Sequence, residues 1–275
     1  MSFLFINSVY AEKNTVTHPA NGLNNSAASL AKILTVISPN GGELWQAGSQ
    51  KLISWNSNEV EFVRVEYTVN NGASWNVVRN SIAANEGNLI WTIPSTLSST
   101  LAKIRIYDIS DPVVGDSSDN VFTIKRLEVT SPTLSEKFQI GTFRSINWIA
   151  SNTIDTVKIE FSTNNGLTWQ LISSSTPASA GTYNWFVPNT TTTSQAFVRL
   201  TDITNPSFVG TSARFSIVSL QITSPIGGEN WFGGSNRSIT WQSSNINKVK
   251  LEYSTNNGAN WFTITDSTNA SSGSY

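Results

Sequence analysis

Residues 62–75 read FVRVEYTVNNGASW, and this stretch decides the fold. Every second residue from Val63 to Tyr67 is apolar, and a period of two indicates a β-strand with one buried face. The Asn-Gly pair at 71–72 supplies the positive φ angles of a tight hairpin turn, so a second strand is expected to begin at Trp75.

The same stretch returns twice, as TVKIEFSTNNGLTW at 156–169 and as KVKLEYSTNNGANW at 248–261. Other phrases return with it, and Trp55, Trp148 and Trp241 are 93 residues apart. Solenoid repeats are only about 20–50 residues long and cannot bury a core alone. A unit of this length is an independent domain, so the chain is expected to be a tandem array.

The period divides the chain into module 1 (34–125), module 2 (126–218) and module 3 (219–275), with almost no linker between them. Module 3 stops at Tyr275, before its Trp-x-x-Pro phrase returns, so the chain is expected to be part of a longer protein. We expect the preceding residues, 1–33, to be the remnant of a signal peptide and a disordered linker.

Seven short strands are expected in each complete module, and no helical period is visible. Beside the hairpin pair, the expected strands of module 1 are 34–37, 51–55, 89–93, 102–107 and 121–124. Seven strands in about 90 residues predict an all-β chain of tandem seven-stranded immunoglobulin/fibronectin-III-like β-sandwiches.

Composition excludes several kinds of active site. There is no Cys, and the only His is His18, so thiol, Ser-His-Asp and histidine–metal chemistry are absent from this sequence. No pair of carboxylates recurs in a way that would build a glycosidase site. We therefore expect no enzymatic activity and no cofactor.

Charge and hydropathy bear on partners and location. The net charge of −1 does not favour nucleic acid. No apolar run reaches the eighteen residues of a membrane span. Residues 1–11, MSFLFINSVYA, resemble the end of a secretory signal, although a basic beginning is missing. We expect a secreted or cell-surface, monomeric protein.

Aromatic residues are the first candidates for a ligand site. Trp55 and its counterparts lie on an expected core strand and are assigned to the core. Trp45 and Trp231 follow Gly-containing turns, and Phe138 replaces them in module 2. These three are the candidate platform for a cell-wall or other extracellular polysaccharide.

Four carboxylates within twelve residues are a weaker candidate, for Ca²⁺. They are Asp108, Asp111, Asp116 and Asp119. Module 2 keeps only Asp202 of the four, and Asp is also common in turns, so a structural role is favoured.

Two resemblances follow from these motifs. The segment STNNGLTW at 162–169 is similar to the Asp-box turn of sialidases, with Asn164 where the Asp would stand. That box stabilises a hairpin and confers no activity.

The ordered phrases Ser-Pro-x-Gly-Gly-Glu-x-Trp, Ile-x-Trp, Asn-Asn-Gly-x-x-Trp, Trp-x-x-Pro, Arg-x-x-Asp and Phe-x-Ile span about 34–275. Together they resemble the Ser/Thr-rich GPI-anchored membrane protein family, whose yeast members act in cell-wall β-glucan assembly. The resemblance implies immunoglobulin-like modules in an extracellular setting. Module 2 lacks the Gly-Gly turn, and no Ser/Thr-rich stalk or anchor signal is present, so a bacterial exported origin is expected.

Three functions remain open. The first is a non-catalytic spacer, adhesion or interaction region of a larger secreted protein, with a surface protein as partner. The second is a carbohydrate-binding module. The third is the accessory region of a secreted hydrolase.

Overall fold

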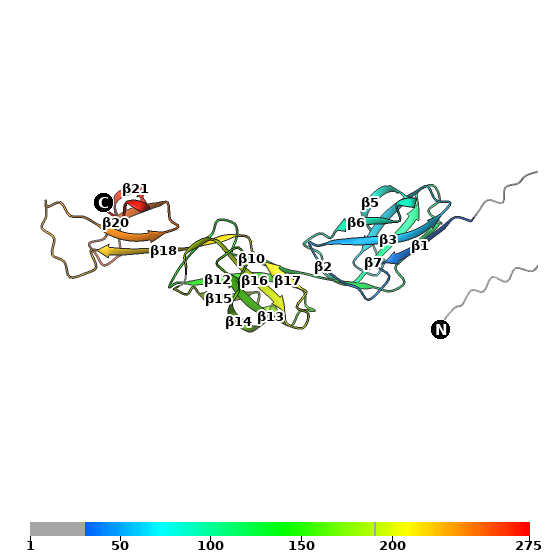
Figure 1. Cartoon of the computed structure of the whole chain (residues 1–275), viewed down its shortest axis with the longest axis horizontal. Coiled ribbons are helices and arrows are strands. Elements are labelled where there is room, and N and C mark those ends of the chain that lie inside the picture. Colours follow the sequence, from blue (N-terminus) through cyan, green and yellow to red (C-terminus); the bar gives the residue numbers. More distant parts are fainter. Residues whose placement is uncertain (1–30, 190) are drawn as a thin grey trace, which may run out of the picture.

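The computed structural model describes residues 31–189 and 191–275, and nearly all of its regular structure is β-strand. The modules follow one another in a row along the longest axis of the molecule (Figure 1). The expected signal remnant lies outside the described residues. β1 begins at Ile33, one residue before the expected start of module 1.

Module 1 is a sandwich of two sheets. One has the order β1-β3-β6 and the other β2-β9-β7-β4-β5. β8 also pairs with β7, further along that strand than β9 does. The strands are β1 (Ile33–Ser38), β2 (Leu44–Gln46), β3 (Gln50–Asn58), β4 (Phe62–Thr68), β5 (Asn76–Ala83), β6 (Asn88–Thr92), β7 (Ser99–Asp108), β8 (Gly115–Ser117) and β9 (Phe122–Lys125), with the 3-10 turn η1 (Ala84–Glu86) before β6.

Module 2 repeats this topology, with sheets β10-β12-β15 and β11-β18-β16-β13-β14 and with β17 paired to β16. Its elements are β10 (Leu127–Ser131), β11 (Lys137–Gln139), β12 (Phe143–Ala150), β13 (Thr156–Ser162), β14 (Gln170–Pro177), η2 (Ala178–Ala180), β15 (Thr182–Phe186), β16 (Thr193–Asp202), β17 (Val209–Thr211) and β18 (Phe215–Ser224).

Module 3 contains β19 (Thr240–Ser244), β20 (Lys248–Tyr253), β21 (Phe262–Asn269) and η3 (Ala270–Ser272). Its first strand is the second half of β18, which pairs with β16 in module 2 and with β19 in module 3. One uninterrupted strand therefore joins these two modules.

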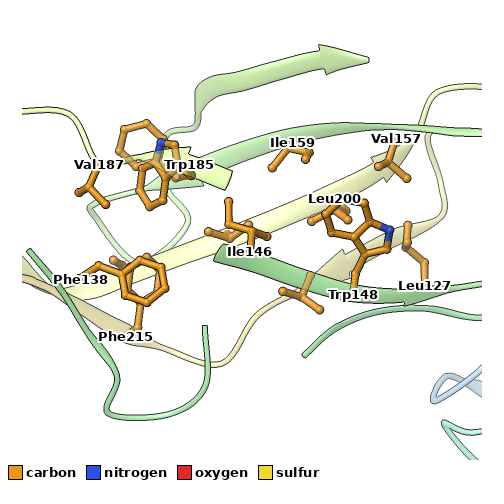
Figure 2. Packing of buried hydrophobic residues seen from close by; sticks show 14 of the residues in the cluster. Leu127, Phe138, Ile146, Trp148, Val157, Ile159, Trp185, Val187, Leu200 and Phe215 are labelled. Atoms are coloured by element: carbon orange, nitrogen blue, oxygen red, sulfur yellow. The ribbon is translucent and has the colours of Figure 1, made fainter. Parts of the chain in front are cut away.

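The cores lie between the two sheets of each complete module. Figure 2 shows the core of module 2, where Ile146 and Trp148 from one sheet face Val157, Ile159 and Leu200 from the other. The alternation in the sequence explains this packing, because residues two apart on a strand point to the same face.

All seven expected strands of module 1 are present, and two short ones were not expected. β2 and β8 are three residues each, too short for a period of two to be visible. β2 runs parallel to β9, which brings the chain back to the edge of the larger sheet.

Candidate functional site

The expected aromatic platform is wrong at two of its three residues. Trp45 is 6% exposed and Phe138 is 4% exposed, and both belong to the cores. The ring of Trp45 lies 4.8 Å from that of Phe122, and Phe138 lies 5.0 Å from Phe215. β2 pairs in parallel with β9, and β11 pairs in parallel with β18. These pairings turn the two rings inward, so their faces are covered by other aromatic rings.

Trp231 differs, because it is 43% exposed. It borders an open apolar hollow on module 3 together with Pro225, Ile239 and Trp261. A role of Trp231 in binding stays a prediction.

The four aspartates do not converge on one point, so the Ca²⁺ candidate is wrong. Each carboxylate accepts a hydrogen bond from a different residue of module 1 or of the segment just before it. Asp108, Asp111, Asp116 and Asp119 accept from Lys32, Val113, Val36 and Asn40, in that order. Among the described residues no group of three His, Cys, Asp or Glu side chains could hold a metal ion.

No helix in the described part of the chain is long and apolar enough to cross a bilayer.

The junction between modules 1 and 2 is closed by a buried ion pair. Lys125 Nζ, at the end of β9, lies 3.3 Å from Asp202 Oδ2, and the two side chains are 10% and 0% exposed. The same ammonium donates to the carbonyl of Thr153 at 3.2 Å and lies 5.4 Å from the ring centroid of Phe208. A lysine from one module is thus held by three groups of the next.

Two further hydrogen bonds cross this junction. Gln46 Nε2 donates to the carbonyl of Val209 at 2.7 Å, and the hydroxyls of Ser98 and Ser151 are 2.9 Å apart. Only Arg126 separates β9 from β10. Because the contacts come from several strands, they restrict bending in more than one direction.

Burial alone raises the pKa of Asp202, but hydrogen bonds from Thr204, Lys125 and Asn205 outweigh it and hold the pKa below its usual range. The charged carboxylate is therefore the form that the junction stabilises.

The same pair stands at the beginning of module 1. Lys32, 93 residues before Lys125, places Nζ 2.6 Å from Oδ2 of Asp108, the counterpart of Asp202. Burial raises the pKa of Asp108, but the hydrogen bonds from Lys32 and Ser110 lower it to about 2.

The second junction is built differently. Val218 replaces the lysine and is buried, and β18 continues through the junction. Thr192 and Ser244 repeat the hydroxyl pair at 2.6 Å, and Gln139 Nε2 donates to the carbonyl of Leu220 at 3.2 Å.

A second recurring feature, the Trp–Arg–Glu cluster, lies on the outer face of the larger sheet. In module 1 it consists of Glu66, Trp75 and Arg105. Arg105 Nε donates to Glu66 Oε2 at 2.7 Å, and the guanidinium carbon lies 4.5 Å from the ring centroid of Trp75. Arg64 Nε also lies 2.9 Å from the other Glu66 oxygen.

Module 2 repeats the cluster with Glu160, Trp169 and Arg199. Arg199 Nε lies 2.8 Å from Glu160 Oε2, and its guanidinium carbon lies 4.2 Å from the Trp169 ring centroid. Burial raises the pKa of Glu160, but the bonds from Arg199 and Lys158 outweigh it and lower it. Each carboxylate is thus neutralised by its own cations, which is a structural role and not that of a free acid or base.

The repeated Asn-Asn-Gly segment is the turn that the sequence predicted. Asn164 Oδ1 accepts from the backbone N–H of Thr168 at 2.9 Å, and Gly166 N–H donates to the hydroxyl of Ser162 at 2.9 Å. These bonds join residues within the turn between β13 and β14 and so stabilise its conformation.

Comparison with known proteins leaves the family open. No protein-family profile matches the chain, and no curated protein matches it. Among solved structures, it is similar to the fibronectin(III)-like modules of Clostridium thermocellum CbhA, at 18% identity and a TM-score of 0.24, over 68% of this chain and 93% of that one.

It is also similar to the FN1–FN3 domains of chicken CNTN1, at 11% identity and a TM-score of 0.32, over 89% of this chain and 86% of that one. A third similar structure holds the N-terminal eight Ig domains of Down Syndrome Cell Adhesion Molecule, at 13% identity and a TM-score of 0.28, over 83% of this chain and 36% of that one. Scores this low carry no argument of their own. The strand order and sheet packing themselves make this chain an all-β tandem array of immunoglobulin/fibronectin-III-like sandwiches.

Proposed function

We propose that the chain is a non-catalytic spacer and interaction array, exported to the cell surface or the extracellular space. The observation that carries the spacer role is the first junction, where Lys125 is inserted between Asp202, Thr153 and Phe208 of the next module. A flexible linker would hold neighbouring domains close without fixing their angle, whereas side chains buried across a junction fix it.

The non-catalytic part of the proposal is supported by how the charged groups are used. Glu66, Glu160, Asp108 and Asp202 are all held by cations of the chain itself. The extracellular part is supported by the signal-like segment at 1–11. An uncharged polar surface rich in Asn, Ser and Thr fits the same setting.

Distances between spin labels test the spacer role. The chain has no native Cys, so pairs can be introduced without background. Val113, Leu167 and Ile226 are 92%, 82% and 79% exposed, one in each module. The pair Val113→Cys/Leu167→Cys spans the first junction, and Leu167→Cys/Ile226→Cys spans the second.

We expect one narrow distance distribution for each pair, measured by double electron–electron resonance. Lys125→Ala should broaden the distribution across the first junction and leave the second unchanged, because Val218 already replaces the lysine there. Broad distributions in the unsubstituted chain would contradict the proposal.

A further inference from the structure

The hairpin turn of every module contains Asn followed by Gly, the dipeptide in which spontaneous deamidation is fastest. The backbone nitrogen of Gly attacks the side-chain carbonyl carbon of Asn and forms a cyclic succinimide. The side-chain nitrogen leaves as ammonia, together with the proton of the Gly N–H. Water then opens the ring to Asp or to isoaspartate, in which the chain runs through the side chain. The pairs at risk are Asn71-Gly72, Asn165-Gly166 and Asn257-Gly258.

The backbone of the turn favours these two residues. Asn71, Asn165 and Asn257 have φ angles of 54°, 59° and 56°, in the left-handed region where Asn is enriched among residues with a side chain. The Gly residues that follow have φ angles of 92°, 81° and 84° in the same order. The fold therefore places a chemically labile dipeptide in every module.

The side chains of these Asn residues are open to attack. Asn71, Asn165 and Asn257 are exposed, and no described residue forms a hydrogen bond with their side-chain amides. Neither burial nor hydrogen bonding thus shields the carbon that is attacked. Protection of the turn has to act on the attacking nitrogen of Gly.

That nitrogen is held in all three turns. The Gly N–H donates to a hydroxyl four residues earlier in the chain, at 3.1, 2.9 and 2.9 Å in modules 1, 2 and 3. To reach the Asn side chain, the nitrogen has to rotate away from this hydroxyl and lose its proton. Because both steps break the hydrogen bond, the bond raises the barrier to attack. The acceptors are Thr68, Ser162 and Ser254.

The hydroxyl is oriented by the first Asn of the turn. Thr68 is buried and donates to Asn70 Oδ1 at 2.7 Å, and Ser162 is buried and donates to Asn164 Oδ1 at 2.9 Å. A hydroxyl whose own proton is used in this way presents its lone pairs to the Gly N–H. The position is Thr in module 1 and Ser in the other two, so the hydroxyl is the feature that all three share.

A fourth Asn-Gly pair, which lies outside the hairpins, has a different acceptor. Gly41 N–H donates to Glu43 Oε2 at 2.8 Å. The side chain of Asn40 is also held, because its amide nitrogen donates to Asp119 Oδ2 at 2.8 Å. Each Asn-Gly pair in the described part of the chain therefore has an acceptor on its Gly N–H.

We propose that the hydroxyl of the repeated turn protects the chain from deamidation, and that Asn71, Asn165 and Asn257 become modification sites when this hydroxyl is lost. The inference goes beyond the spacer role, because a rod is rigid or flexible whatever its chemical lifetime. It assigns to the Ser or Thr of each turn a task that hairpin geometry alone does not require.

Mass spectrometry of the full chain tests the proposal. The chain is incubated at mildly alkaline pH and digested, and the Asp and isoaspartate products of each pair are quantified over time. A synthetic peptide of residues 160–171 supplies the rate for an isolated turn. Asn165 should convert at least about tenfold more slowly in the full chain than in this peptide, because the peptide does not hold the Gly N–H in place.

Ser162→Ala removes the acceptor from one turn and leaves the other two turns as controls in the same molecule. Asn165 should then convert about fivefold to tenfold faster, the factor that corresponds to one hydrogen bond, while Asn71 and Asn257 keep their rates. Ser162→Thr keeps the hydroxyl, as Thr68 does in module 1, and should leave all three rates unchanged.

A matched variant separates the hydroxyl from a general loosening of the turn. Asn164→Ala removes the hydrogen bond to Thr168 N–H but keeps the acceptor of Gly166 N–H. It should therefore accelerate deamidation of Asn165 less than Ser162→Ala does. An acceleration as large as that of Ser162→Ala would overturn the proposal, as would an unchanged rate in Ser162→Ala.

Hydrogen exchange shows whether module 2 stays folded in each variant. If Ser162→Ala unfolds module 2, Thr68→Val in module 1 and Ser254→Ala in module 3 decide instead. Unchanged rates at Asn71 and Asn257 in those variants overturn the proposal. None of these results depends on the label distances that test the spacer role.

Discussion

In every module an indole hydrogen bond helps to hold the 3-10 turn against the core. Trp55 Nε1 donates to the carbonyl of Ala84 at 2.8 Å, and Trp148 does the same to Ala178 at 2.8 Å. In module 1 the hydroxyl of Ser57 also donates to that carbonyl, at 2.9 Å. Module 2 has Ala150 at the position of Ser57, so its carbonyl depends more on the indole.

Replacing each Trp by Phe should therefore have unequal costs. We expect Trp148→Phe to destabilise module 2 by about 3 kcal/mol, because it leaves a poorly bonded buried carbonyl and lost volume. Trp55→Phe should cost module 1 about 1 kcal/mol less, because Ser57 still donates. Hydrogen exchange followed by mass spectrometry separates the modules and measures both.

The double variant Trp55→Phe/Ser57→Ala is the control. It should raise the cost in module 1 to about that in module 2. Equal costs for the two single variants would contradict the role given to Ser57.

At the scale of the element, the hairpin turns are stabilised by side-chain bonds that Asn supplies. Asn164 accepts from Thr168 N–H through Oδ1 and donates to the Thr168 hydroxyl through Nδ2, at 2.9 and 2.8 Å. Gly166 has a φ of 81°, where an added Cβ would meet the Trp169 ring at 3.4 Å.

Substitutions of Asn164 should show whether its acceptor Oδ1 or its donor Nδ2 stabilises the turn. Asn164→Ala should destabilise module 2 by about 1–2 kcal/mol because the Thr168 N–H loses its partner. Asn164→Asp should cost less than about 0.5 kcal/mol, since a carboxylate keeps the acceptor and the Thr168 hydroxyl can donate to it. Gly166→Ala should cost about 1 kcal/mol or more.

Thermal unfolding of the full chain, with hydrogen exchange to assign the transition to module 2, measures these costs. If Asn164→Asp were as costly as Asn164→Ala, the acceptor would not be the stabilising group.

Elements were predictable from the sequence where their signal is local. The strand 62–68 and the turn after it follow from alternation and from the Asn-Gly pair. The burial of Trp45 could not be predicted in the same way, because it depends on β2 pairing in parallel with β9, about eighty residues later. The Gly-containing turn before Trp45 suggested exposure, whereas the pairing turns the ring onto Phe122.

The pairing of Tyr107 with Gly115 could not be predicted for the same reason. Tyr107 and Gly115 face each other only through the register of β7 and β8. One signal was available, because these residues differ from Thr201 and Val209 while the surrounding phrases repeat.

At the scale of the whole molecule, we expect the two junctions to differ in their response to acid. The first is closed by Lys125 and Asp202, whereas the second contains Val218 at the position of the lysine and carries no ion pair between described side chains. An array with an ion pair at one junction and only neutral contacts at the other can lose its alignment at one place while keeping it at the other.

The pH at which the first junction should open follows from the pKa of Asp202, which lies below its usual range in the folded chain. A carboxylate of this kind stabilises the closed junction fully above its ordinary pKa of about 3.9, and the stabilisation is lost as the pH falls through the lower, folded value. Between pH 7 and pH 5 we therefore expect no change in either label distance.

Below about pH 4 the distribution across the first junction should broaden, because a protonated Asp202 no longer attracts Lys125, while the distribution across the second stays narrow. In Lys125→Ala, the distance distribution across the first junction should already be broad at pH 7 and should not broaden further as the pH falls. Broadening at both junctions with the same midpoint would instead indicate acid unfolding of the modules themselves, and far-ultraviolet circular dichroism at each pH separates the two cases. A first junction that stays narrow down to pH 2 would mean that Gln46 and Ser98, with their neutral hydrogen bonds, are enough to hold modules 1 and 2 in line.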